Sequence, residues 1–341
     1  RALVGDEVRD LTKRELQVFG KVLREALHEG GFGFSLGLQY SSARKIPSWE
    51  FEYLCRVTKE EGGVFAPHLR ENTKQDVMYT TQILDRISVE TFIPRFLPLK
   101  GEEDQYREAF HVLSCASQHV HVGVSFEEGS FVELYTLLPE WAQKNNLEAM
   151  AAMLEDEWFE ERIRKEMPKI HAQDVVILTA PRNEFLEGKT LKELGEVFGT
   201  RGSRDTLLAL MRRTRLHAVV SIKNVNHALA EEISGDSRVL VASHAYAPRT
   251  FSRWLSLALD KDPISLAAAV EKITAMPAVK FGIMRRGVIK EGNFADLTMF
   301  SIGGNKEIVV VSTFVNGKAV LRDGEMTGVH AGRVLRHKKN G

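Results

Sequence analysis

Short apolar runs alternate with helix-like stretches along most of this chain, and that alternation constrains its fold more than any other feature. The runs have strand length and lie at 32–38, 64–69, 92–97, 120–126, 175–179, 218–222 and 239–243. Strands that alternate with helices form parallel sheets covered by helices. Because no Gly-rich dinucleotide fingerprint interrupts the series, the pattern favours a β/α barrel over a Rossmann sheet, with catalytic groups at the carboxyl ends of the strands.

A different pattern closes the chain. Gly287, Gly292 and Gly317 separate short apolar runs at 297–300 and 308–315, which is typical of strands joined by tight turns. We therefore predict two parts, a barrel over residues 1–283 and a small β module over residues 284–336.

Composition narrows the classes of partner. Of 341 residues 43% are hydrophobic, which supports a sizeable core, and the 46 basic residues balance 46 acidic ones. This balance argues against nucleic acid or a membrane surface as a partner. Two cysteines are too few for a disulfide framework, and no apolar run is long enough to span a bilayer. We expect a cytoplasmic protein whose partners are small molecules or other subunits.

Two segments carry recognisable motifs, Ala-Pro-His-Leu-Arg-Glu at 66–71 and a Gly-x-Ile-x-x-Gly-x-x-Ala-Asp-Leu-like run at 287–297. They resemble, in order, the Ala-Thr-His-x-Arg strand and the closing run of the N-acyl-D-amino-acid deacylase (D-aminoacylase) family of the amidohydrolase superfamily. Further similar segments lie at 31–40, 137–141, 186–191 and 328–336. The resemblance covers essentially the whole chain and implies a TIM-like β/α barrel of the metal-dependent hydrolase type with a C-terminal β-sandwich segment.

The same resemblance implies that the barrel is incomplete. The matching region starts inside the family's domain, and the chain begins with Arg1 and no leader-like segment, so we expect it to be part of a longer protein. The part that is missing would hold the first barrel strands, the opening half of the β-sandwich and a His-x-His motif. A barrel without its opening strands would expose apolar edges, so we expect this segment to aggregate or to need a partner. A homo-oligomer is one arrangement that would supply such a partner.

Membership of this family would imply zinc-dependent hydrolysis of the amide bond of N-acyl-D-amino acids. His68 matches a metal ligand of the family, whereas Pro98 stands where the family has a second histidine. His244 occupies the place of the catalytic aspartate, and a histidine can accept a proton or bind metal but lacks the carboxylate's charge.

Three cations match the substrate-binding end of the family's site. Lys100 and Arg249 correspond to cations that hold the substrate carboxylate, and Arg70 lies in the same motif as His68. An arginine suits this role because its guanidinium can bind both carboxylate oxygens. The family's tyrosine-containing strand is replaced by Val-Gly-Val-Ser-Phe at 122–126, which removes a hydroxyl donor.

His119 and His121 have the spacing of a metal-binding pair, since alternate residues of a strand share a face. They lie at the amino end of their strand rather than at the catalytic end, and we predict a structural role for both. Cys55 and Cys115 are predicted to be small buried residues rather than ligands.

Two other interpretations remain open. One is a degenerate amidohydrolase that binds a small carboxylate or a protein partner without chemistry, which the losses at Pro98 and His244 motivate. The other is a dihydroorotase-like or urease-like enzyme that uses the superfamily barrel differently. The segments at 66–70 and 186–189 favour the deacylase over this last reading.

Overall fold

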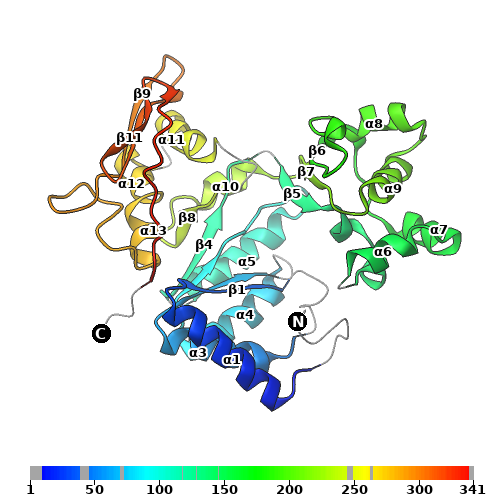
Figure 1. The fold of residues 1–341 in the computed structure, drawn as a ribbon, viewed down its shortest axis with the longest axis horizontal. Helices are drawn as coiled ribbons and strands as arrows, with labels where there is room; N and C mark the ends of the chain where they lie inside the picture. The colour runs from blue at the N-terminus through cyan, green and yellow to red at the C-terminus, as the bar shows by residue number, and fades with distance from the viewer. Residues whose placement is uncertain are drawn as a thin grey trace. The chain divides into compact units, whose positions relative to one another are not determined.

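The computed structural model describes residues 10–38, 46–69, 73–116, 118–127, 129–144, 146–243, 249–261 and 264–337 (Figure 1). The chain divides into two compact units. The small unit consists mainly of residues 127–226, and the large unit consists of residues 11–37, 47–126 and 227–341. In the described parts, no helix combines the length and the apolar character that crossing a membrane requires.

The large unit is built on a five-stranded parallel sheet. Its strand order is β1-β2-β3-β4-β8, and every neighbouring pair is parallel. The strands are β1 (Gly33–Gly37), β2 (Val64–His68), β3 (Thr91–Ile93), β4 (Val120–Val124) and β8 (Val239–Val241). Four of them fall inside predicted apolar runs, whereas β3 begins one residue before the run at 92–97. The parallel pairing confirms the barrel-type class of fold.

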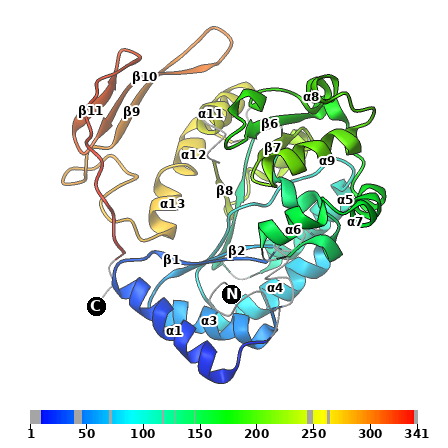
Figure 2. The ribbon, with the colours of Figure 1, turned by 45° about the vertical axis from the view of Figure 1, so that its right-hand side comes forward.

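Helices precede, connect and follow these strands. They are α1 (Lys13–His28), α3 (Ser48–Glu60), α4 (Lys74–Ile87), α5 (Glu103–Cys115), α10 (His227–Ile233) and α11 (Thr250–Lys261). Figure 2 shows α1, α3 and α4 on one side of β1 and β2. The start of α1 is set locally, because the Thr12 hydroxyl accepts from the Glu15 amide while the Glu15 carboxylate accepts from the Thr12 amide at 2.7 Å. This reciprocal capping box satisfies two amides that the first helical turn leaves without partners.

The chain closes with two short helices and an antiparallel sheet, all within the large unit. The helices are α12 (Leu266–Glu271) and α13 (Ala275–Lys280), and the strands are β9 (Leu297–Ile302), β10 (Ile308–Val315), β11 (Lys318–Arg322) and β12 (Glu325–Met326). The sheet order is β12-β11-β10-β9. Asn316 and Gly317 join β10 to β11 with φ values of 49° and 79°, the positive pair that a tight hairpin turn favours. The predicted β segment is thus confirmed, while its boundary at residue 284 stays a prediction.

The small unit contains a three-stranded antiparallel sheet. The order β5-β7-β6 places β7 (Val219–Ile222) between β5 (Ser130–Glu133) and β6 (Val175–Thr179). Four α-helices, α6 (Leu147–Met153), α7 (Glu157–Glu166), α8 (Leu191–Phe198) and α9 (Ser203–Thr214), accompany short 3-10 helices at Leu134–Leu137, Glu140–Ala142, Ala172–Asp174 and Glu184–Leu186. The apolar runs at 175–179 and 218–222 therefore form strands, as predicted, but antiparallel ones outside the parallel sheet.

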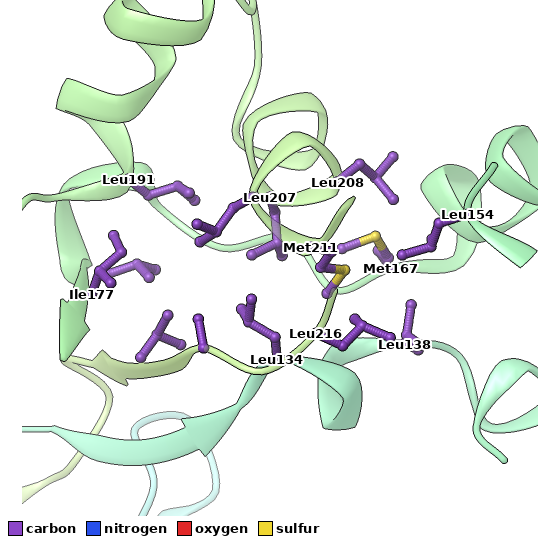
Figure 3. Packing of buried hydrophobic residues seen from close by; sticks show 14 of the residues in the cluster. Leu134, Leu138, Leu154, Met167, Ile177, Leu191, Leu207, Leu208, Met211 and Leu216 are labelled. Atoms are coloured by element: carbon purple, nitrogen blue, oxygen red, sulfur yellow. The ribbon is translucent and has the colours of Figure 1, made fainter. Parts of the chain in front are cut away.

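A continuous apolar core holds the small unit together (Figure 3). Leu134 and Leu138 face Leu207 and Met211 of α9, with Ile177 of β6 at one side of the cluster. These residues are separated by up to 77 positions in sequence, from 134 to 211, so they meet only when the unit folds. Their burial gives the unit a core of its own.

We expect Leu207→Ala to lower the free energy of unfolding by about 2–5 kcal/mol, because it leaves a cavity in this core. The side chain of Leu207 is 2% exposed, whereas Val197 on neighbouring α8 is 63% exposed. Val197→Ala is the matched control and should stay within about 0.5 kcal/mol of the parent. Urea unfolding followed by tryptophan fluorescence measures both, and equal effects would contradict the assignment of the core.

Candidate active site

The two faces of the parallel sheet are distinguished by its aromatic side chains. Phe65 of β2 stacks on Phe34 of β1 with ring centroids 5.8 Å apart, and it meets Phe51 of α3 edge to face at 5.3 Å. Phe65 therefore faces the helices. Because side chains alternate along a strand, Ala66 and His68 point to the opposite, inner face.

Register extends this assignment across the sheet. Phe65 pairs with Thr91 of β3, and Thr91 pairs with Val120 of β4, so these residues share the helix-facing side. The inner face of β4 consequently holds His121 and Gly123, followed by Ser125 just beyond the strand. A Cβ built on Gly123 would lie 2.7 Å from the Pro94 carbonyl oxygen and 2.9 Å from the Ala242 Cβ, so only glycine fits between these neighbours.

His68 is the last residue of β2 and lies half-buried on the inner face. It pairs in register with Gly37, the last residue of β1. The prediction that His68 stands at the carboxyl end of a parallel strand agrees with this placement, and this is the end at which β/α barrels hold their catalytic groups. Its role as a metal ligand stays a prediction.

The segment after β3 is tightly packed, and Pro98 is buried within it. The Phe96 amide donates to the Gly123 carbonyl oxygen at 3.0 Å, and the Phe96 ring stacks on Tyr106 of α5 at 4.5 Å. Lys100 follows, exposed, in the loop between β3 and α5. Arg249 is exposed immediately before α11, in the connection that follows β8.

His68, Lys100 and Arg249 thus all follow, or end, strands of one parallel sheet on its carboxyl side. The other two predicted site residues, Arg70 and His244, lie outside the described residues. Sequence reasoning passed over Ser125, whose hydroxyl oxygen is buried without a hydrogen-bond partner in the described chain at the same end of β4. Its only sequence signal was that it is a polar residue near the carboxyl end of the apolar run at 120–126.

The described residues do not by themselves fit a metal centre. Across the ranges from residue 10 to residue 337 that the structure describes, no three His, Cys, Asp or Glu side chains come together as ligands. A structural or catalytic zinc site needs three or four such groups. His68 alone therefore does not constitute a zinc site, and the buried Pro98 offers no ligand atom in its side chain.

The His119-x-His121 pair belongs instead to a charged network at the amino end of the sheet. The Glu90 carboxylate lies 2.6 Å from His119 Nδ1 and accepts from Lys280 Nζ at 2.7 Å. Lys280, from the end of α13, also donates to the His119 carbonyl oxygen at 2.6 Å, and its side chain is only 3% exposed. The predicted placement of the pair at the non-catalytic end agrees with this geometry.

Burial and ion pairing together set the pKa values of this network. Burial lowers the pKa of Lys280, although the ion pair with Glu90 opposes this shift. Desolvation acts to raise the pKa of Glu90, but the hydrogen bonds and charges of Lys280 and His119 together lower it overall. His121 has a pKa lowered to about 4, first by burial and then by the positive charge of Lys280. Its Nδ1 atom is buried without a hydrogen-bond partner in the described chain, as expected for a histidine held neutral.

Both cysteines lie in helices of the large unit and take no part in this network. Cys55 is buried in α3, as predicted, and burial raises the pKa of its thiol. Cys115 is exposed at the end of α5, so the prediction that it is buried was wrong. The apolar pattern of a helix does not show which side of its last turn another element covers.

We expect stability to fall as the pH drops from 6.5 to about 4, because unfolded His121 binds a proton in this range while the folded residue, with its pKa of about 4, resists it. Partial exposure of the ring limits the loss to about 1–3 kcal/mol. His121→Asn removes the titration and should flatten this slope in urea unfolding.

Phe92→Leu is the matched control for this experiment. Phe92 pairs in register with His121 on the same inner face, and its side chain does not titrate. Phe92→Leu should change the free energy of unfolding by a similar amount at every pH. A slope that is unchanged in His121→Asn would show that His121 is not the titrating group.

Comparisons with known proteins agree with the fold. No family model matches the chain. A D-aminoacylase of Alcaligenes xylosoxydans xylosoxydans is 25% identical over 361 aligned positions, covering 98% of this chain and 67% of the relative. An N-acyl-D-aspartate deacylase from the same organism is 23% identical and covers 98% of this chain and 66% of the relative. The chain therefore spans about two thirds of the length of these curated relatives.

Solved structures give the same fold. The crystal structure of D-aminoacylase, described as defining a subset of amidohydrolases, matches with a TM-score of 0.72 at 22% identity, covering 97% of this chain and 68% of that one. N-acyl-D-glutamate deacylase from Bordetella bronchiseptica, complexed with zinc and a phosphonate inhibitor, matches with a TM-score of 0.75 at 20% identity, covering 96% and 67%. The fold is that of an amidohydrolase.

The two curated relatives, a D-aminoacylase and an N-acyl-D-aspartate deacylase, each align with 98% of the chain. The chain is therefore similar to D-aminoacylases over nearly its whole length, which agrees with the resemblance of its motifs.

Proposed function

We propose that the protein containing this chain hydrolyses the amide bond of N-acyl-D-amino acids, releasing a carboxylate and the free D-amino acid. The observation that carries this proposal is the alignment of 98% of the chain with a D-aminoacylase. Both curated relatives are deacylases by name, which favours a hydrolase over a binding protein without chemistry. The parallel sheet supports it too, because its carboxyl end carries the candidate residues.

We propose that the active protein holds a divalent metal and that this metal is zinc, as in the N-acyl-D-glutamate deacylase structure. His68 would supply one ligand from the end of β2. The described residues do not complete the ligand set, so the remaining ligands must come from elsewhere in the protein. His244, at the position of the family's aspartate, is proposed as the group that accepts a proton during hydrolysis.

The substrate's carboxylate would be bound by cations in the loops beyond the sheet. Lys100 lies in the loop after β3, and Arg249 lies just before α11. Both are exposed, so each can reach a ligand in solvent without first leaving a buried position. Arg70, two residues beyond the end of β2, is proposed as a third substrate-binding group. A guanidinium offers two parallel hydrogen bonds to one carboxylate, and the ammonium of lysine adds a point charge.

The cellular setting is proposed on composition. Two cysteines, a balanced charge and a small-molecule substrate fit the cytoplasm. We propose a homo-oligomer because β1 and β8, the outer strands of the parallel sheet, each have one edge without a partner strand among the described residues, and open edges invite pairing.

We expect the full-length protein to release free D-amino acid from N-acetyl-D-amino acids, and His68→Ala to reduce kcat/KM and zinc content at least about hundredfold, since even outer-shell changes at metal sites cost up to that factor. His111→Ala, at an exposed position on α5, is the matched control and should retain both. Product release and bound metal are measured on the same preparations. A full-length protein that binds no metal and releases no product would sink the proposal.

We expect Lys100→Met and Arg249→Met each to raise KM about tenfold or more, because each removes a charge-assisted hydrogen bond worth about 1.5–3 kcal/mol. The comparison substrate is the matching N-acetyl-D-amino acid amide, which lacks the carboxylate. Its KM should change little in either variant. Equal losses for the acid and the amide would show that these cations do not recognise the carboxylate.

A further inference from the structure

The last described segment of the chain, residues 331–337, links the C-terminal sheet to the amino end of the parallel sheet (Figure 1). We call it the C-terminal strap. It has no regular secondary structure, and most of its side chains are exposed. Both of its ends, however, are fixed by specific contacts within the large unit.

The first anchor is Asn316, in the turn between β10 and β11. Its side-chain nitrogen donates to the Ala331 carbonyl oxygen at 2.7 Å. Its side-chain oxygen accepts from Arg286 at 2.7 Å, and its amide donates to the Asp296 carboxylate at 2.7 Å. Arg286 and Asp296 also form an ion pair with each other. The start of the strap is therefore part of a closed polar network.

The second anchor lies where α1 ends and β1 begins. The His337 amide donates to the Gly30 carbonyl oxygen at 2.9 Å, and the Arg336 guanidinium donates to the Glu29 carbonyl oxygen at the C-cap of α1. Helix C-termini leave carbonyls without partners, so this guanidinium fills a vacant position. The His337 ring meets Phe32 edge to face, with centroids 5.9 Å apart.

Three glycines from separate turns approach this anchor. A Cβ on Gly30 would lie 2.5 Å from Arg336 Cβ, which is closer than real side chains allow. The corresponding positions on Gly62 and Gly282 would lie 3.8 Å and 3.6 Å from the His337 ring. All three have positive φ, from 63° to 104°, so they turn the chain sharply beside the strap. The strap thus contacts turns that are far apart in sequence.

The turns at Gly30 and Gly62 directly precede β1 and β2, whereas Gly282 follows α13. The Val64 amide, the first in β2, donates to the Phe32 carbonyl oxygen at 2.9 Å, directly beside the His337 ring. β1 is an outer strand of five residues with glycine at both ends, so it has few side chains to hold it. An outer strand of this kind is a low-stability element unless something fastens it.

We propose that the C-terminal strap is a latch that fastens the amino ends of β1 and β2 and ties this edge of the parallel sheet to the C-terminal sheet. Since β2 ends at His68, the latch supports the strand of the candidate ligand from its opposite end. The proposed latch depends only on contacts within the described chain. It is therefore independent of the proposed hydrolysis.

Hydrogen exchange of single amides in the full chain tests the latch. His337→Ala removes the ring beside Phe32, and Arg336→Ala removes the bond to Glu29. Each should speed exchange of the Val64 amide at least about tenfold, because local opening becomes easier. The Val122 amide lies in β4 of the same sheet and donates to the Arg238 carbonyl oxygen, next to the start of β8. It should exchange at its original rate.

Val334→Ala is the matched control, since this residue lies in the strap with 85% of its side chain exposed. It should leave both amides unchanged. The latch is overturned if His337→Ala and Arg336→Ala exchange at Val64 like this control. It is equally overturned if Val64 and Val122 accelerate together, because that pattern reports general destabilisation rather than release of one edge.

Discussion

The register of the parallel sheet is the constraint on which the rest of the large unit depends. Each strand alternates its side chains between the helices and the inner face, so a slip of one residue would exchange the two sets. Phe65 fixes the register of β2 by packing between Phe34 and Phe51. His68 then points inward at the carboxyl end as a direct consequence. The packing of one aromatic residue on the helix side thereby orients the candidate ligand on the other.

The two ends of this sheet differ in how their charged side chains are buried and bound. At the amino end, buried ammonium groups bind backbone carbonyls, with Lys280 on His119 and Lys272 on Asp236 and Val239. The strap adds its contacts at the same end, beside β1 and β2. The carboxyl end instead leaves Lys100 and Arg249 exposed in loops. A division between a stabilising end and a chemical end is the general arrangement in β/α barrels.

Much of the fold could be predicted from local sequence. Four strands of the parallel sheet fell within predicted apolar runs and β3 overlapped one, while the capping box of α1 and the turn at Asn316-Gly317 each depend on residues close together in sequence. Part of the site was also predictable, since the position of His68 follows from its place at the end of an apolar run. The exposure of Cys115 could not be predicted, nor could the burial of the Ser125 hydroxyl without a hydrogen-bond partner in the described chain, because both depend on which other elements cover these residues.

The sequence by itself determined where strands and helices form, because the alternation of apolar residues and the chemistry of caps and turns act over a few neighbouring positions. Its motifs also carried the resemblance to D-aminoacylases, which the curated relatives share over 98% of the chain. Only the tertiary structure decided which strands pair, sending β6 and β7 into an antiparallel sheet with β5. It alone brought Lys280 to Glu90, 190 residues away, and His337 to Phe32. Periodicity fixes the direction of a side chain but not its partner, since pairing is decided by the packing of the whole unit.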